Sequence, residues 1–301
     1  FWENIGDPVQ KNMGLPSWIK DIIVSLVENN DTYSYSDSKG VLETREFLAT
    51  LNNKKGGTQI TEEDILFFNG LGDAIAKLYQ YLIPSSRIIG PSPAYSTHSS
   101  AEAAHANTHP LTYSLNPNDN WYPDMDDLYM QVKYNPNIVG ILIINPDNPT
   151  GMVYPKFILD RFVEIAKEFN LFLICDEIYM NVTYNGASNY TLAEYIQDVP
   201  GISLKGISKE MPWPGGRCGW MEFYNRKTKP EFDRLCETLE NAKMIEVSST
   251  KLPQLAIPLI MQDSRYPDYL KTQSEKIGKR SNLIKEMLSS VKGIKFNETF
   301  G

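Results

Sequence analysis

The chain of 301 residues is long enough to bury one large core and part of a second, and its composition is ordinary for a globular protein. Its net charge of −8, without any basic run, argues against nucleic acid as a partner. Its longest apolar runs, at residues 139–144 and 171–175, are far too short to span a bilayer, so no membrane partner is expected. The three cysteines, Cys175, Cys218 and Cys236, favour free thiols in a reducing compartment, which indicates the cytoplasm.

The elements predicted in the first part of the chain alternate between helices and strands. A turn-forming cluster at residues 4–8 precedes a helix that starts at Ser17, and a second helix is expected over residues 42–51. The apolar run 65–68 has the length of a buried strand, and it leads through the turn Gly70-Leu71-Gly72 into a helical pattern. This order of strand, glycine turn and helix is typical of α/β proteins.

Three further strands are expected at residues 87–89, 138–144 and 171–175. A helix is expected after the first of them, and another over residues 159–169, between the second and the third. The continuous apolar runs are typical of strands that are buried on both faces. The alternation therefore predicts an α/β fold with a mostly parallel sheet.

From about residue 225 the composition changes to charged, helix-favouring sequence. This part predicts helices over residues 232–244 and 269–288 and the start of a strand at residues 291–296. The chain begins without a methionine and stops after Gly301 with no closing element. We therefore expect that a segment is missing at each end and that a second domain is incomplete.

Polar residues follow the predicted strands, and in open α/β sheets a ligand lies outside the carboxyl ends of the strands. The residues at those positions are Gly70, Leu71, Gly72, Tyr95, Asn148, Asp176, Tyr179, Ser208, Lys209 and Arg217. A glycine turn at the start of a helix presents backbone N–H groups and the positive end of the helix dipole, which suit a phosphate. An arginine and a serine hydroxyl can complete such a phosphate site.

The remaining groups match a flat, positively charged ring that carries an aldehyde. Tyr95 can stack on such a ring, and Asp176, delivered by an apolar strand, can pair with a cationic ring nitrogen. Lys209 follows a short β-like run and precedes a loop rich in proline and glycine, and a lysine in a partly dry pocket can form a Schiff base. Together the phosphate, ring, cationic nitrogen and aldehyde describe pyridoxal 5′-phosphate.

At these residues the chain resembles the fold-type I pyridoxal-phosphate aminotransferases of class I/II. Residues 145–151, Asn-Pro-Asp-Asn-Pro-Thr-Gly, are similar to the family's Asn-Pro-x-Asn-Pro-Thr-Gly, and residues 176–179, Asp-Glu-Ile-Tyr, to its Asp-Glu-x-Tyr. Ser208-Lys209, with Arg217 eight residues later, resembles the family's lysine-to-arginine block. The three blocks occur in the family's order.

The resemblance implies a three-layer large domain with a mostly parallel sheet and a smaller α+β domain. Residues 1–30 would be an N-terminal segment joining the small domain, and residues 31–225 the large domain that binds pyridoxal phosphate. Residues 226–301 would form an interdomain helix and an incomplete small domain.

The resemblance also implies a role for each residue at the reacting end of the site. Lys209 would form the internal aldimine and, once released, carry the proton between the substrate Cα and the cofactor C4′. Asp176 would keep the pyridine nitrogen protonated, and Tyr95 would stack on the ring. Tyr179 and Asn148 would hydrogen-bond the phenolic oxygen of the cofactor.

The same resemblance implies that a larger set of residues would hold the phosphate: Gly70, Leu71, Gly72, Ser208 and Arg217. Tyr35, in a Tyr-x-x-x-x-Gly pattern that ends at Gly40, would reach the phosphate of a neighbouring subunit, which implies a homodimer. Gly6, in a Gly-Asp-Pro sequence, would lie with Asn148 beside the substrate carboxylate.

Three departures from the family pattern stand out. Gly206 occupies a position where the family often has a serine, so a phosphate contact is expected to be lost. The segment Pro212-Trp213-Pro214 is unusual between the lysine and the arginine, and it could reshape that wall of the pocket. The arginine that clamps the substrate carboxylate belongs to a C-terminal part of the family that this sequence does not contain.

The leading function is an aminotransferase that moves an amino group from an L-amino acid to a 2-oxo acid. A lyase or decarboxylase on the same fold, such as a β C–S lyase, and a non-catalytic binding module remain alternatives. A nicotinamide dehydrogenase is set aside because residues 70–75 lack the third glycine of Gly-x-Gly-x-x-Gly. No metal is expected, because His98, His105 and His109 lack ligand spacing. The amino donor is not identified, although Trp18, Tyr95 and Trp213 could favour a bulky side chain.

Overall fold

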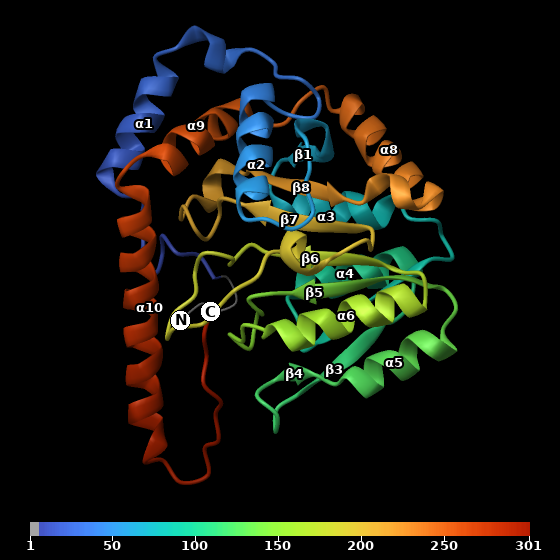
Figure 1. Cartoon of the computed structure of the whole chain (residues 1–301). Helices are drawn as coiled ribbons and strands as arrows, with labels where there is room; N and C mark the ends of the chain where they lie inside the picture. The colour runs from blue at the N-terminus through green and yellow to red at the C-terminus, as the bar shows by residue number, and fades with distance from the viewer. Residues whose placement is uncertain (1–5) are drawn as a thin grey trace.

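The computed structural model describes residues 6–301, and its centre is an eight-stranded sheet in the order β1-β8-β7-β6-β5-β2-β3-β4 (Figure 1). The strands are β1 (Ile65–Phe68), β2 (Arg87–Ser92), β3 (Thr112–Asn116), β4 (Tyr122–Pro123), β5 (Ile138–Ile144), β6 (Phe172–Asp176), β7 (Gly201–Gly206) and β8 (Gly219–Tyr224). β3, β2, β5, β6 and β7 run parallel, whereas β8 is antiparallel to both β7 and β1, and β4 is antiparallel to β3. The predicted α/β fold with a mostly parallel sheet is confirmed.

Helices cover both faces of this sheet. The α-helices of residues 6–301 are α1 (Ser17–Val27), α2 (Leu42–Lys54), α3 (Leu71–Gln80), α4 (Ser96–Ala106), α5 (Met125–Tyr134), α6 (Lys156–Glu168), α7 (Leu192–Tyr195), α8 (Pro230–Ile245), α9 (Lys251–Gln262) and α10 (Tyr266–Ser289). α3 and α8 pack into the core on one face, and α2, α5, α6, α7 and α9 pack into the core on the other. The architecture is therefore three-layered.

The strands contribute to both cores by simple alternation. In β5, Ile143 belongs to one core while Leu142 and Ile144 belong to the other, and all three are at most 2% exposed. Successive side chains of a strand point to opposite faces, so a strand covered on both sides needs apolar residues at nearly every position. This explains the continuous apolar runs in the sequence.

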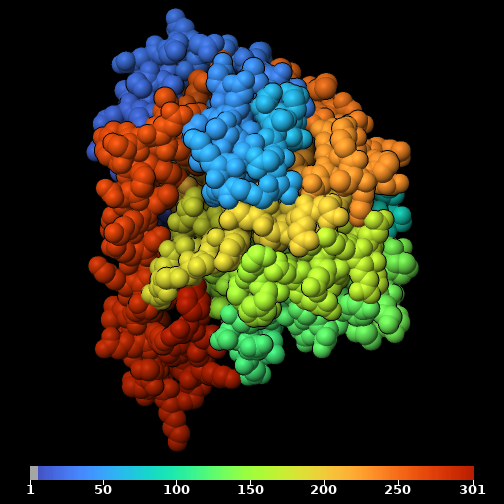
Figure 2. Space-filling view, in the orientation of Figure 1, coloured from blue at the N-terminus to red at the C-terminus, as the bar shows by residue number. Residues whose placement is uncertain are grey.

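The C-terminal part differs from the sequence prediction. Both predicted helices are present, as α8 and α10, but the strand expected at residues 291–296 is wrong, because residues 294–301 form an irregular segment. The segment runs back beside α10, where the Phe300 amide donates to the Gly151 carbonyl and the Tyr184 amide to the Phe300 carbonyl. Its backbone thus bonds to loops instead of to a strand. Figure 2 shows α10 and the residues after it along one side of the molecule, extending below the rest of the chain in this view.

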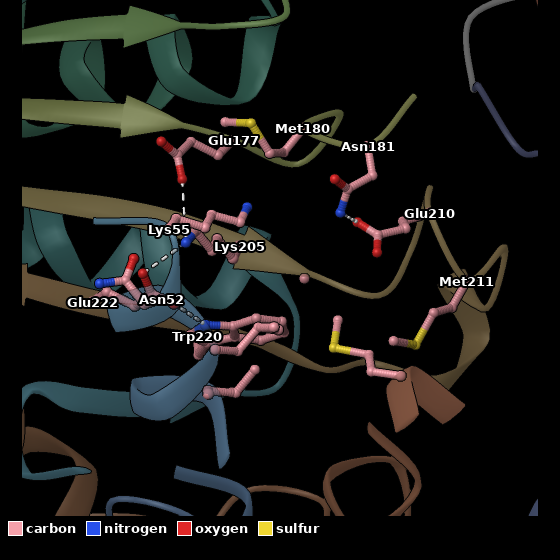
Figure 3. A pocket seen from close by; sticks show the side chains of 14 residues that line it. Asn52, Lys55, Glu177, Met180, Asn181, Lys205, Glu210, Met211, Trp220 and Glu222 are labelled. Carbon is pink, nitrogen blue, oxygen red and sulfur yellow. Dashed lines mark hydrogen bonds and ion pairs between the residues drawn. The ribbon is translucent and has the colours of Figure 1, made fainter. Parts of the chain in front are cut away.

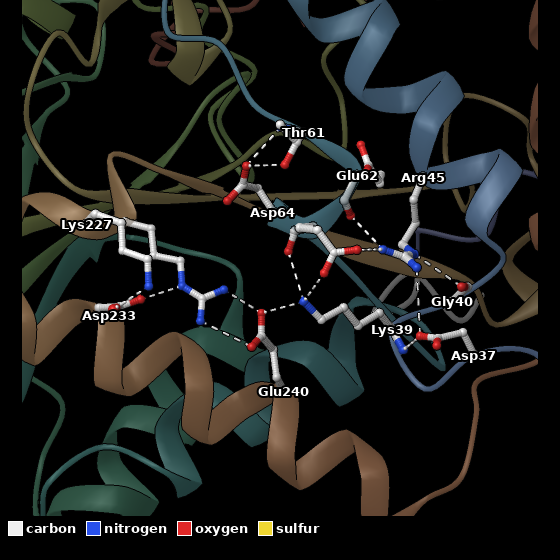
Figure 4. A network of polar contacts seen from close by, with 12 residues as sticks. Asp37, Lys39, Gly40, Arg45, Thr61, Glu62, Asp64, Lys227, Asp233 and Glu240 are labelled. Carbon is white, nitrogen blue, oxygen red and sulfur yellow. Dashed lines mark hydrogen bonds and ion pairs between the residues drawn. The ribbon is translucent and has the colours of Figure 1, made fainter.

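A chain of ion pairs ties α8 to the segment before α2 (Figure 4). The guanidinium of Arg226 bonds Glu240 of α8, and Lys39 Nζ lies 3.0 Å from Glu240 Oε1 and 3.0 Å from Glu63 Oε2. Arg45 of α2 adds a contact of 3.4 Å to Glu63. These partly buried charges fix the stretch 37–45 against the sheet domain.

Within residues 6–301, no helix is long and apolar enough to cross a membrane.

A buried charge cluster lies on the α2 side of β7 (Figure 3). Lys205 Nζ is 2.7 Å from Glu222 Oε2 and 3.4 Å from Glu177 Oε2, and both carboxylates are at most 2% exposed. Ser203 donates a further hydrogen bond to Glu177, whose pKa is raised by burial. Burial also opposes ionisation of Glu222, but the Lys205 ammonium lowers the pKa of that carboxyl below its usual value.

The cluster gives a stability prediction for Lys205→Met. The change leaves two carboxylates in the core without their cation, and breaking a buried ion pair in this way typically costs about 3–5 kcal/mol. We expect a loss of that size in the free energy of unfolding, measured by urea titration. Lys156→Met is the matched control, because Lys156 is half-exposed and pairs with Asp160 one helical turn away, and it should cost less than about 0.5 kcal/mol. An equal effect of the two changes would contradict the prediction.

Candidate functional site

Asp176 is the last residue of β6 and lies at the carboxyl edge of the sheet, 3% exposed. Its Oδ1 accepts the amide of Ile178 at 3.1 Å, and its Oδ2 lies 2.9 Å from Nε2 of His98. The carboxylate therefore has a fixed orientation although it is buried. Such a group is suited to hold a positive charge at the strand ends.

His98, in the first turn of α4, is a site residue that the sequence analysis missed. It is 2% exposed, and its Nδ1 has no hydrogen-bond partner among residues 6–301. The ring of Tyr95 lies edge-on to the His98 ring, with centroids 6.2 Å apart. One signal was available in the sequence. His98 follows Tyr95 by three residues at the start of a predicted helix, and residues three apart lie on the same face of a helix.

The motif loop at residues 145–151 is held by its own polar side chains. The backbone N–H of Asn145 donates to the Asp176 carbonyl at 3.1 Å, and the side-chain oxygen of Asn145 accepts a hydrogen bond from the backbone N–H of Tyr154 at 2.8 Å. Asp147 accepts hydrogen bonds from the backbone and the hydroxyl of Thr150. The bond to Asp176 attaches the loop to β6, the other bonds hold the loop in its shape, and Asn148 comes within 3.4 Å of the Tyr179 hydroxyl.

Lys209 approaches the same place from the loop after β7. Its Nζ lies 5.8 Å from the ring centroid of Tyr179, and the Tyr179 hydroxyl is 3.4 Å from Nδ2 of Asn148. Burial raises the pKa of Tyr179 to about 12, and Asp176 adds to that effect. Burial lowers the pKa of Lys209, although the charges of Asp7 and Asp176 oppose the shift.

The N-terminal segment meets this lysine. The Gly6 carbonyl accepts a hydrogen bond from Lys209 Nζ, and a Cβ added at Gly6 would lie 3.5 Å from the same nitrogen. The predicted substrate-side residue Gly6 is thus brought next to the predicted reactive amine. Residues 4 and 5 of the predicted turn cluster lie outside the described part of the chain.

The predicted phosphate end lies at the start of α3. Gly70 precedes the helix with φ +89°, and a Cβ added there would lie 2.8 Å from Cζ of Arg217. Only glycine therefore allows the guanidinium to sit against this helix end, where backbone N–H groups favour an anion. Leu71 begins the helix, and Gly72 in its first turn has open space around it.

Ser208, Gly206 and Tyr35 complete the set of predicted positions. Ser208 is half-buried and immediately precedes Lys209. Gly206 cannot easily be a serine here, because a Cβ would lie 3.1 Å from the Cys218 carbonyl oxygen. Tyr35 is not brought to the other residues within this chain, and its side chain is 81% exposed.

The described residues fit a phosphorylated pyridine aldehyde. A glycine cradle with an arginine, a buried carboxylate and an amine of lowered pKa lie along one edge of the sheet. Such an arrangement can bind an anion, a cationic ring nitrogen and a carbonyl at once. In the part of the chain that the structure describes, no three His, Cys, Asp or Glu side chains are grouped to hold a metal.

Comparison with known sequences places these residues in a family context. The family model described as aminotransferase class I and II matches residues 4–299. An aminotransferase of Methanocaldococcus jannaschii is 57% identical over 300 residues, which cover 100% of this chain and 69% of that protein. The glutamate-pyruvate aminotransferase AlaA of Escherichia coli is 34% identical over 220 residues, which cover 72% of this chain and 53% of AlaA.

Solved structures agree in fold. An alanine aminotransferase from Pyrococcus furiosus superposes with a TM-score of 0.90 at 27% identity, over 99% of this chain and 74% of that one. The tyrosine aminotransferase from Leishmania infantum gives a TM-score of 0.87 at 19% identity, over 98% of this chain and 79% of that one, a likeness of fold alone.

The electrostatics of the site predict how Lys209 reacts. In cofactor-free protein, competitive acetylation followed by peptide mass spectrometry should show Lys209 reacting at lower pH than a free lysine derivative added as the reference amine, because burial lowers the pKa of Lys209. Asp7→Asn should lower the pKa of Lys209 further, since it removes a nearby negative charge. A Lys209 that reacts over the same pH range as the reference amine would contradict the prediction.

Proposed function

Because the chain belongs to the aminotransferase class I and II family, we propose that it moves an amino group from an L-amino acid to a 2-oxo acid with pyridoxal phosphate bound at Lys209. The observation that carries this proposal is the convergence of Asp176, Tyr179 and Lys209 at one edge of the sheet, with the cradle of Gly70 and Arg217 at the same edge. When bound, the cofactor supplies an aldehyde and a ring that accepts the electron pair left on the substrate Cα.

The roles proposed for the residues follow from their surroundings. Asp176, oriented by His98, would hold a proton on the ring nitrogen, and Tyr95 would cover one face of the ring. Tyr179 and Asn148 would donate hydrogen bonds to the phenolic oxygen. Gly70, Leu71, Gly72, Ser208 and Arg217 would hold the phosphate.

Lys209 would also move the proton in the reaction. A general base works best when its pKa lies near the working pH, and burial lowers the pKa of this amine toward that range. Its contact with the Gly6 carbonyl places it beside the segment proposed to meet the substrate carboxylate. Gly6 and Asn148 would contact that carboxylate.

Alanine, glutamate and their 2-oxo acids are the substrates we propose. Several relatives that match about 72% of the chain at 31–34% identity act, by their names, on alanine or on glutamate and pyruvate. The tryptophans that could have favoured a bulky donor make other contacts, Trp18 with Tyr269 and Arg265, and Trp213 with Gly216. These contacts weaken the argument for a bulky donor that rested on the two tryptophans.

Absorption spectroscopy tests this function. Addition of L-alanine to the purified protein should bleach the visible band of the lysine-bound cofactor, and 2-oxoglutarate should restore it. Lys209→Ala should lack both changes. Release of pyruvate and ammonia from an amino acid without any 2-oxo acid would instead support a lyase. Indifference to every amino acid would favour a binding module.

We also propose a homodimer in which Tyr35 completes the neighbouring site. Several large apolar residues of the described chain are also exposed, among them Tyr33 at 69%, Met244 at 59%, Ile245 at 79% and Val247 at 52%. Exposed large apolar residues can belong to an interaction surface. A second copy of the chain is the partner that would use the Tyr35 hydroxyl.

Mixed dimers test the shared site. Dimers formed from equal amounts of Lys209→Ala and Tyr35→Ala chains should regain roughly a quarter of the wild-type rate, because half of them would carry one intact site. Each variant mixed with itself is the control. No gain on mixing would place Tyr35 outside the partner's site.

The cytoplasm remains the compartment we propose. The three cysteines, Cys175, Cys218 and Cys236, are buried and unpaired. Burial raises the pKa of all three thiols, which keeps them in their unreactive form. Unpaired buried thiols are typical of proteins in a reducing compartment.

A further inference from the structure

The unusual segment Pro212-Trp213-Pro214 packs on the loop that carries Arg217. A Cβ added at Gly216 would lie 2.8 Å from Cε2 and 2.9 Å from Cδ2 of Trp213, so the indole fills the space that a side chain at position 216 would need. The Gly216 amide donates to the Trp213 carbonyl at 3.1 Å. The indole is half-buried and also packs against the core on the α2 side of the sheet.

The turn under this indole sets the backbone of Arg217. Residues Pro214–Gly216 form one 3-10 turn, and Arg217 leaves it in the left-handed region, at φ +46° and ψ 60°. A residue with a Cβ pays roughly 1–2 kcal/mol for that conformation, so surrounding contacts must hold it. The Arg217 amide and its Nη1 both donate to the Pro214 carbonyl, at 3.4 and 3.2 Å.

The other side of the guanidinium is confined by the cradle before α3. Cζ of Arg217 would lie 2.8 Å from a Cβ at Gly70, so the group sits directly against that backbone. Pro214 and Gly70 thus bracket the guanidinium, and its direction depends on the closed turn that Trp213 covers. Arg217 itself is exposed and has no acidic partner in the described part of the chain to hold it.

We propose that Trp213 is a positioning residue for the phosphate: its indole, stacked on Gly216, keeps the 214–216 turn closed and so aims Arg217 at the N-terminus of α3. This inference rests on the proposed function, because it takes the phosphate of the cofactor as the anion. It assigns to this chain's own unusual segment the task of orienting an otherwise unpaired arginine. Trp213 acts through Arg217 and need not touch the cofactor.

The role predicts a selective effect on ligands that carry a phosphate. Binding of pyridoxal, which lacks the phosphate, uses Lys209 and Asp176 but not Arg217. Loss of the indole should therefore weaken pyridoxal 5′-phosphate and leave pyridoxal nearly unchanged. A general loosening of the fold would weaken both ligands alike.

The test measures equilibrium binding of pyridoxal 5′-phosphate and of pyridoxal to cofactor-free protein. Trp213→Ala should weaken the phosphorylated ligand by about tenfold or more, the scale of one well-placed charge-assisted contact, and change pyridoxal by less than about twofold. Gly216→Ala should do the same, because its methyl group would displace the indole without removing it. Trp121→Ala, at a half-buried tryptophan in the turn between β3 and β4, is the matched control and should change neither affinity.

A double-mutant cycle completes the experiment. With Arg217→Lys already present, Trp213→Ala should add less than about twofold, because both changes remove the same contact. Equal weakening of both ligands, unchanged binding in Trp213→Ala and Gly216→Ala, or full additivity with Arg217→Lys would overturn the inference. If the wild-type protein bound neither ligand, the proposed function itself would fail.

Discussion

Strands β5 and β6 lie between two layers of helices, and nearly every side chain along them is covered. A covered strand can carry polar groups only where it ends or where a partner neutralises them. Asp176, at the end of β6, uses the first solution, and Lys205 of β7 with Glu222 of β8 uses the second. The same burial that stabilises the sheet thus concentrates the reactive groups at its carboxyl edge.

Burial at this edge of the sheet determines the orientation and the charge of the groups in the site. The carboxylate of Asp176 is fixed by His98 and by the Ile178 amide, so it presents a definite direction to a ligand. Half-burial of Lys209 opposes its charge more than the nearby carboxylates favour it, and its pKa is lowered. At the other end of the site, the exposed guanidinium of Arg217 lies beside Gly70. One edge of the sheet therefore separates the region that we propose for an anion from the region that we propose for proton transfer.

The sequence analysis predicted the elements that depend on residues close together in the chain. The apolar runs predicted β1, β5 and β6, which are present. The three motif blocks indicated Asn148, Asp176 and Lys209, which stay predictions as site residues. The sequence analysis missed His98 because its hydrogen-bond partner, Asp176, lies 78 residues away and no spacing rule links the two residues. The expected strand at residues 291–296 was wrong because a strand needs a neighbour to pair with, whereas the backbone amides of Val291 and Ile294 bond within turns, to the carbonyls of Leu288 and Val291. Strand β8 and the cluster of Lys205 with Glu222 likewise depend on pairing across the sheet.

The central claim is that Lys209 is the residue that bonds the cofactor. Borohydride reduction of the protein purified with pyridoxal phosphate, followed by peptide mapping, tests it most directly, because reduction makes an imine bond permanent. The account predicts a phosphopyridoxyl group on the peptide that contains Lys209 and on no other lysine. A group on a different lysine, or none at all in cofactor-saturated protein, would contradict it.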